Sequence, residues 1–386
     1  MKLHRFVMLL GSAVLFCQVS FAAAESPIKK TEGKEPLVQL AILLDTSNSM
    51  DGLIEQTKGQ LWKIVNEFIN AKQSGKRPEV QVALFEYGKS TLSAASGYIR
   101  QIQPLTNDLD KISEELFALK TNGGDEYCGW VIQEAVEKLA WSKSPNDLKV
   151  IFIAGNEPFT QGPVDYRKSC KAAIEHGIIV NTIHCGTEQE GLNTKWQDGA
   201  LLAEGKYMVI NQNQAVVHYE APQDKDIARL GEELNKTYIA YGANGLASQA
   251  RQNAQDANAA SFAFQGSLVN RAICKASDNY RNGAWDLVDA AKDGKVDVSK
   301  LKKEELPTEL QTMKETERVQ YVEQKKKERE KIQKQIQELN ASRAKYVAEQ
   351  VAKRSNGTQT LDTVMVSAIR EQATKKNYQF GECGED

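Results

Sequence analysis

Hydrophobic and polar positions form two alternating patterns along the first two thirds of this chain. Short apolar runs, such as 37–44 and 149–154, predict strands that are covered on both faces. Between such runs, as along 52–69, apolar residues recur every three or four positions, which predicts amphipathic helices. Strands alternating with helices predict an α/β fold over residues 37–240, a mainly parallel, doubly wound (Rossmann-like) sheet flanked by helices.

One pair of predicted strands departs from this alternation. The segments 80–87 and 98–102 are separated only by a short turn rich in Gly and Ser. Parallel neighbours need a long crossover connection, whereas antiparallel neighbours can be joined by a short turn. We therefore expect an antiparallel hairpin at an edge of the sheet.

The composition changes after Tyr241, where Ala, Gln and Asn become frequent and large apolar residues become sparse. This change predicts an all-α C-terminal region over residues 241–386. Neither Pro nor Gly occurs in the highly charged stretch 308–354, which predicts one long helix.

The apolar residues of this long helix leave two interpretations open. Ile332, Ile336 and Leu339 are spaced by four and three, as in the seam of a coiled coil, which suggests self-association of the chain. Residues 323–331 contain no apolar residue and interrupt the seam. The alternative is a solvated helix that packs on its own neighbours.

The first residues have the pattern of an export signal. Lys2 and Arg5 precede a largely apolar segment, and Ala22–Ala24 provides an Ala-x-Ala cleavage site. We expect a signal peptide over residues 1–24, a linker over 25–36, and a periplasmic or secreted mature protein. The apolar segment has about 16 residues, fewer than the roughly 20 that cross a bilayer, so we expect no stable membrane span after cleavage.

Five cysteines follow the predicted cleavage site, so at least one thiol is free or pairs between chains. Export brings them into an oxidising environment where disulfides form. Cys170 and Cys185 lie on a predicted helix and on the strand that follows it, which makes them the candidate pair. A zinc site is less favoured because no Cys-x-x-Cys spacing occurs. The five are Cys128, Cys170, Cys185, Cys274 and Cys383.

Charge and motifs restrict the classes of function. A formal net charge of −2 over 386 residues gives no basic surface for nucleic acid. No phosphate-binding Gly-rich loop, Gly-x-Ser-x-Gly or His-Glu-x-x-His motif occurs, so we do not expect an enzyme. A metal-dependent hydrolase using His184 and Cys185 is a less favoured alternative, since adjacent strand residues face opposite sides.

The candidate chemistry follows the first predicted strand directly. Asp45, Ser47 and Ser49 occupy alternate positions of a short loop between that strand and a helix. A carboxylate and two hydroxyls are hard oxygen ligands of the kind that Mg²⁺ prefers. Ligands of parallel α/β sheets bind at the carboxyl ends of strands, which is where this loop lies.

This order of elements, strand, Asp-x-Ser-x-Ser, amphipathic helix and hairpin, resembles a von Willebrand factor type A domain over residues 37–240. The resemblance implies a metal-ion-dependent adhesion site whose first loop is formed by Asp45, Ser47 and Ser49. Such a site holds Mg²⁺ (or Mn²⁺ or Ca²⁺) and binds a carboxylate of a partner protein. We therefore expect an exported protein-binding module. The alternative is a scaffolding protein that acts through its C-terminal helices.

Two further loops depart from the pattern of the family. Asp125 stands where the family places a Thr ligand, and residues 154–158 lack the Asp that usually follows the fourth strand. Asp125 is therefore a candidate metal ligand, or else the cap of a helix that begins at Glu126. Asn156 and Glu157 are candidates for additional contacts to the metal or to its ligands.

Overall fold

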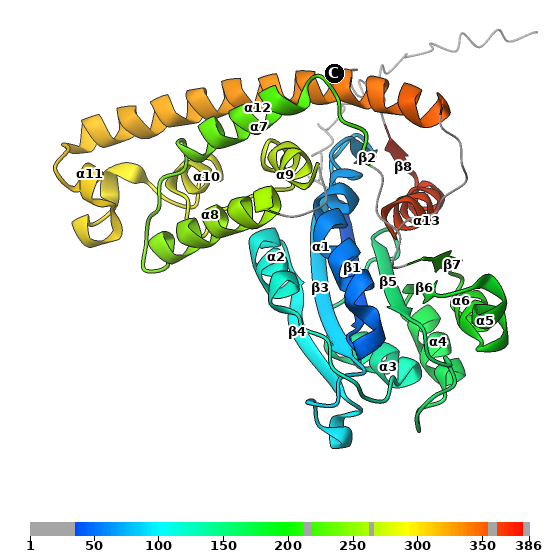
Figure 1. Cartoon of the computed structure of the whole chain (residues 1–386). Coiled ribbons are helices and arrows are strands. Elements are labelled where there is room, and N and C mark those ends of the chain that lie inside the picture. The colour runs from blue at the N-terminus through cyan, green and yellow to red at the C-terminus, as the bar shows by residue number, and fades with distance from the viewer. Residues whose placement is uncertain (1–34, 212–217, 262–265, 354–360, 381–386) are drawn as a thin grey trace, which may run out of the picture. The chain divides into compact units, whose positions relative to one another are not determined.

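Six strands form the central sheet, in the order β4-β3-β1-β5-β6-β7 (Figure 1). The computed structural model describes residues 35–386 apart from 212–217, 262–265, 354–360 and 381–386. β1 pairs in parallel with β3 and β5, and β6 and β7 continue the parallel sheet. The strands are β1 Leu37–Asp45, β3 Glu79–Tyr87, β4 Ile99–Thr106, β5 Leu148–Gly155, β6 Ile179–Cys185 and β7 Tyr207–Ile210.

The predicted hairpin is confirmed. β3 and β4 pair antiparallel, with irregular register between Val82 and Phe85, and β4 forms one edge of the sheet. The short turn between them makes an antiparallel return the only simple connection. The expected fold class, a mainly parallel sheet flanked by helices and followed by a helical region, is therefore correct.

Helices cover both faces of the sheet because the buried strands are apolar on both sides. Leu40 and Ile42 of β1 belong to one core cluster, while Ala41 and Leu43 belong to the other. The first cluster is covered by α1, α2 and later helices, and the second by α3, α4 and α6. The helices of this part are α1 Asp51–Asn66, α2 Leu109–Ala118, α3 Cys128–Lys138, α4 Tyr166–Glu175, α5 Glu188–Asn193, α6 Trp196–Leu202 and α7 Asp224–Asn235.

The C-terminal helices extend the first of these clusters. Residues of α9, α12 and α13 join it, and the described residues from Glu35 onward form one compact unit. Two short strands also pair, β2 (Ala71–Gln73) with β8 (Tyr378–Phe380). The C-terminal helices are α8 Gly245–Ser261, α9 Ser267–Lys275, α10 Leu287–Lys292, α11 Thr308–Gln311, α12 Glu315–Lys353 and α13 Leu361–Lys375.

The long helix begins later than predicted. Residues 308–311 form the separate helix α11, and α12 begins only at Glu315. The backbone N–H of Lys314 donates to Glu317 Oε2 over 2.8 Å, and the buried Arg318 donates from Nε to the carbonyls of Leu310 and Met313 over 3.0 Å each. These polar contacts stabilise a break between α11 and α12. The sequence did not predict this break, because the segment contains neither Pro nor Gly.

The apolar seam of α12 packs inside the chain itself. Ile332 and Ile336 are buried in the first core cluster, and Leu339 packs against it. These side chains are therefore not available to a second copy of the helix. This arrangement supports the alternative interpretation, a charged helix that packs on its own neighbours, over self-association through the seam.

A buried ion-pair network joins α12 to the helices beneath it. Arg329 Nη1 contacts Asp286 Oδ2 at 2.6 Å and Asp289 Oδ1 at 2.7 Å, and Nη2 donates to the carbonyl of Thr237 over 2.7 Å. The guanidinium also lies 4.1 Å from the ring centroid of Tyr238. Arg329 is 4% exposed and Asp286 is fully buried, so both charges depend on this pairing.

The structure corrects the predicted disulfide. Cys170 and Cys185 are both buried free thiols. Cys170 belongs to the second core cluster and Cys185 to the first, on opposite faces of the sheet. The helix and strand do pack together, but strand side chains alternate between faces, and Cys185 points away from α4.

Some sequence-based predictions concern residues that the structure does not describe. The signal peptide over 1–24, most of the linker over 25–36, and Cys383 lie outside the described residues. None of the described helices is both long enough and apolar enough to cross a membrane.

Candidate functional site

The site begins at the carboxyl end of β1, where Asp45 is completely buried. Its Oδ1 accepts a hydrogen bond from the backbone N–H of Ser47 over 2.8 Å. Its Oδ2 is buried and has no hydrogen-bond partner within the described part of the chain. A buried polar atom without a partner costs roughly 1–3 kcal/mol, and more when it is charged. Asp45 therefore presents an unsatisfied oxygen at the position predicted for a metal ligand.

The two hydroxyls of the motif lie beside each other. Ser47 Oγ and Ser49 Oγ are 3.2 Å apart, and Ser49 Oγ donates to Asn156 Oδ1 over 3.4 Å. The structure thus brings together the first predicted loop and the loop after β5. Ser47 is buried, whereas Ser49 is exposed, so the group opens toward solvent on the side of Ser49.

Glu126 is the residue that sequence reasoning missed. It is buried, with 6% of its surface exposed, and the charge of Asp45 raises its pKa. A β-carbon added at Gly88 would lie 2.6 Å from Glu126 Cγ and 2.8 Å from Asp45 Oδ1, so Gly88 lies against both side chains. Gly88 has φ +79°, a conformation that glycine adopts without strain.

Asp125 has a different position from the one predicted. It is exposed, and its Oδ2 accepts a hydrogen bond from Tyr127 Oη over 3.3 Å. It does not cap a helix that begins at Glu126, because α3 begins at Cys128 and its N-cap is Tyr127. The N–H of Glu126 is bound instead by Gln161 Oε1 over 2.7 Å. The Gly-rich loop places Glu126 inward, and no sequence signal distinguishes it from its exposed neighbour Asp125.

The loop after β5 completes the surroundings of Asp45. A β-carbon at Gly155 would lie 2.6 Å from Tyr87 Oη and 3.1 Å from Asp45 Oδ2, so only glycine leaves this carboxylate its space. Glu157 lies close enough for its charge to act on both Asp45 and Glu126. Its backbone carbonyl accepts a hydrogen bond from Trp196 Nε1 over 2.9 Å, which fixes the loop.

Burial raises the pKa of both carboxyl groups, Asp45 and Glu126. Loss of solvation raises the pKa of Asp45 to about 7, against the lowering effect of the Ser47 hydrogen bonds. Loss of solvation and then the charges of Asp45 and Glu157 raise the pKa of Glu126 to about 8. A cation between these oxygens would reverse both effects, because it favours the ionised forms.

The donor set fits a hard divalent cation. Asp45, Ser47 and Ser49 with Glu126 offer two carboxylates and two hydroxyls, which suits Mg²⁺ and leaves positions for water. No group of three or more His, Cys, Asp or Glu side chains that could hold a metal occurs among the described residues. The site therefore depends on the serine hydroxyls as well as on the carboxylates.

We predict that magnesium stabilises the protein more at pH 8.5 than at pH 5.5. The pKa of Asp45 is raised from 3.8 to about 7 by folding, so its effect on stability is most favourable at low pH and is lost as pH rises through about 7. For Asp45 alone the free energy of unfolding falls by about 2 kcal/mol between pH 5.5 and 8.5. Thermal unfolding in EDTA and in Mg²⁺ at the two pH values measures this difference.

The Asp45→Asn variant is the control, since it removes one of the two titrating groups and should reduce the pH dependence in EDTA, while Glu126, whose pKa is raised to about 8, keeps part of it. An equal magnesium-induced shift at both pH values would contradict the buried, metal-linked carboxylates.

His184 and Cys185, the residues considered for a hydrolase, face different sides of the sheet. His184 faces Trp196, with ring centroids 5.7 Å apart, whereas Cys185 belongs to the core on the other face of the sheet. Burial also raises the pKa of the Cys185 thiol, which disfavours the nucleophilic thiolate. The two side chains therefore do not form the dyad that a nucleophilic mechanism needs.

Comparison with known families agrees with this arrangement. Residues 39–201 match the family model of the von Willebrand factor type A domain. This part of the chain has the fold of that domain, the VWA fold. The match includes the Asp45 loop, Glu126 and the loop after β5, and the VWA fold accounts for the sheet and its covering helices. No curated protein matches the sequence.

Solved structures similar to the VWA domain come from different contexts. BatB of Bacteroides thetaiotaomicron is 17% identical and covers 45% of this chain and 90% of its own, with a TM-score of 0.35. The SpRpn10 VWA domain is 19% identical, covering 47% and 100%, with a TM-score of 0.35. The pilus adhesin SpaC of Lactobacillus rhamnosus GG is 12% identical, covering 47% and 29%, also with a TM-score of 0.35.

Proposed function

We propose that this protein is a binding module that holds a divalent cation, preferably Mg²⁺, and uses it to bind an acidic group on a partner protein. The observation that carries the proposal is the buried Oδ2 of Asp45, which has no hydrogen-bond partner among the described residues, together with a second buried carboxylate nearby, Glu126. A cation satisfies both oxygens at once. Asp45, Ser47, Ser49 and Glu126 would hold it, while Asn156 orients Ser49.

The role of the cation is to supply positive charge and exchangeable water positions. A VWA domain is suited to protein interaction, and a partner carboxylate could replace one bound water. Two buried carboxylates hold the ion firmly but also neutralise it. We therefore expect partner binding that is moderate in affinity and requires the metal, rather than catalysis.

We also propose that the mature protein acts outside the cytoplasm, in the periplasm or after secretion. The charged start, apolar segment and Ala-x-Ala site of residues 1–24 support this proposal. The scaffolding alternative has less support, because the apolar residues of α12 that would serve it are buried in the chain's own core.

Partner capture tests the proposal. Immobilised full-length mature protein is incubated with extract from its native cells in Mg²⁺ or in EDTA, in parallel with the Asp45→Ala variant. We expect a set of partners that is retained only by the wild type in Mg²⁺. Identical sets in all three conditions, with the variant folded by circular dichroism, would contradict metal-dependent recognition.

A further inference from the structure

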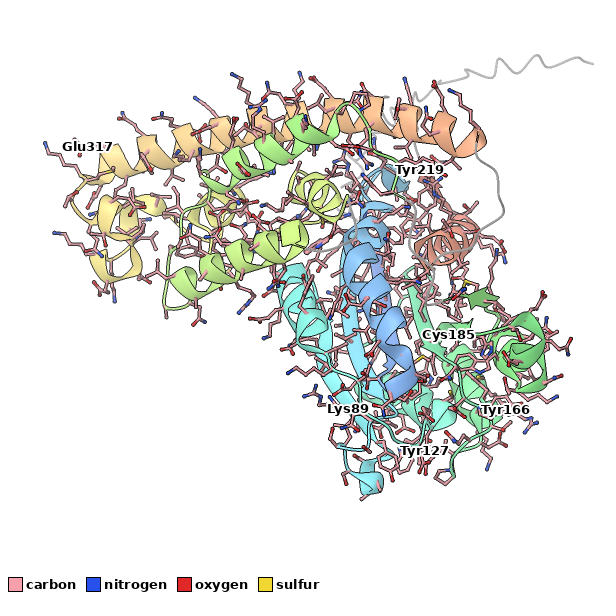
Figure 2. The ribbon with its side chains drawn as sticks, in the orientation of Figure 1. Lys89, Tyr127, Tyr166, Cys185, Tyr219 and Glu317 are labelled. Carbon is pink, nitrogen blue, oxygen red and sulfur yellow. The ribbon has the colours of Figure 1, made fainter. Side chains whose placement is uncertain are left out.

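An aromatic cluster borders the candidate metal site, consisting of Tyr98, Tyr127 and Trp130. The rings of Tyr127 and Trp130 are parallel, with centroids 6.3 Å apart, and Tyr98 meets Tyr127 edge-on at 5.8 Å. All three side chains are partly exposed. Tyr98 directly precedes β4, Tyr127 directly precedes α3, and Trp130 lies in the first turn of α3. Figure 2 shows Tyr127 at the same end of the domain as Lys89, which follows Gly88.

The backbone around this aromatic cluster is shaped to hold the rings in place. A side chain at Gly162 would lie 2.5 Å from Tyr127 Cδ1, and one at Gly97 would lie 2.6 Å from Trp130 Cε3. Tyr98 itself has φ +55°, which is unusual for a bulky residue. Its backbone N–H donates to the carbonyl of Ser93 over 3.0 Å, and its carbonyl accepts from Gly88 N–H over 3.2 Å. Strain of this kind tends to gather at binding sites.

Asp125 gives the aromatic cluster a negative charge. It is exposed and contacts Tyr127 Oη, and no Lys or Arg pairs with it in the described part of the chain. Two nearby cations, Lys89 in the turn after β3 and Arg100 on β4, are instead both paired with the buried Glu86. A carboxylate beside partly exposed aromatic rings is an environment that attracts a Lys or Arg side chain.

The adjacent residues Asp125 and Glu126 therefore contribute to two different sites, the surface beside the aromatic cluster and the candidate metal site. Glu126 points inward toward Asp45, and Asp125 lies on the surface beside Tyr127. Their Cα atoms are about 3.8 Å apart, so an acidic and a basic side chain of one extended segment, a few residues apart, could occupy both.

We infer that the partner of this protein presents a Lys or Arg side chain to Asp125 and Tyr127, within a few residues of the acidic group that binds the cation. This inference rests on the proposed function and specifies its partner. A purely acidic surface does not fit, because Asp125 and Glu157 would repel it. The occupant is an extended, mixed-charge segment of another protein.

Selection from a displayed peptide library tests the inference. The probes are random dodecapeptides with one fixed central Asp, selected on full-length mature protein in Mg²⁺ and in EDTA. The Asp125→Asn variant is run in parallel, with Glu330→Gln, an exposed carboxylate on α12, as the matched control. We expect Lys or Arg to be enriched about fivefold near the fixed Asp on the wild type and on the Glu330 variant, but not on Asp125→Asn.

The outcomes separate this inference from the proposed function. Magnesium-dependent selection without basic enrichment, or with enrichment that persists in Asp125→Asn, would overturn the inference and leave metal-dependent recognition intact. No difference between Mg²⁺ and EDTA would overturn both. A conservative Tyr127→Phe variant should keep the enrichment, because the aromatic face remains.

Discussion

Replacing Arg329 by glutamine is expected to lower the free energy of unfolding by about 3–5 kcal/mol, the largest stability change we predict. The substitution leaves Asp286 and Asp289 buried without their cation, and it also removes the donor to the Thr237 carbonyl and the contact with Tyr238. Equilibrium denaturation followed by circular dichroism measures the change.

Arg229→Gln provides the matched comparison. Arg229 pairs with Asp226 and Glu233 on the surface of α7, where its side chain is 56% exposed. Exposed ion pairs contribute little to stability because solvent screens them, so this variant should unfold close to the wild type. An equal decrease in the free energy of unfolding in the two variants would show that the buried network of Arg329 stabilises the packing of α12 no more than a surface ion pair does.

Replacing Asp45 by asparagine is expected to weaken magnesium binding at least about 100-fold, since even outer contacts of a metal site change affinity by 10- to 100-fold. The same variant should not lose stability in EDTA at pH 8. It removes a buried carboxylate whose Oδ2 has no partner in the described chain, so the metal-free protein should unfold within about 1 kcal/mol of the wild type, or be more stable.

Isothermal titration with Mg²⁺ and chemical denaturation in EDTA measure the two effects, with Glu330→Gln as the control that changes neither. Unaltered magnesium affinity in Asp45→Asn would remove the basis of the proposed site. A large loss of stability in EDTA would show instead that Asp45 is a structural residue.

The elements that could be predicted from sequence are those with strong local signals. The apolar run of β1, the hairpin of β3 and β4, and the position of Asp45, Ser47 and Ser49 all follow from periodicity and from the rule that ligands gather at strand ends. The interruption in the apolar seam of α12 also indicated, as one of two interpretations, a helix that packs on its own core, and the structure has this arrangement.

The features that could not be predicted depend on side-chain direction and on distant partners. Whether Asp125 or Glu126 turns inward depends on loop conformation, which composition does not determine, and Gly88 on another loop makes the space for Glu126. The separation of Cys170 and Cys185 follows from strand register, where a shift of one residue exchanges the two faces. The break before α12 depends on tertiary contacts of Arg318.

The closure of the first core cluster by α13 and β8 affects when the fold can be completed during synthesis. Tyr378 Oη donates to the carbonyl of Leu37, a contact between residues 341 positions apart. At 5–20 residues per second a ribosome needs roughly 20–70 seconds to span that interval. During that time the newly made β1 lacks its final cover, so the nascent chain should remain a substrate for chaperones until α13 has emerged.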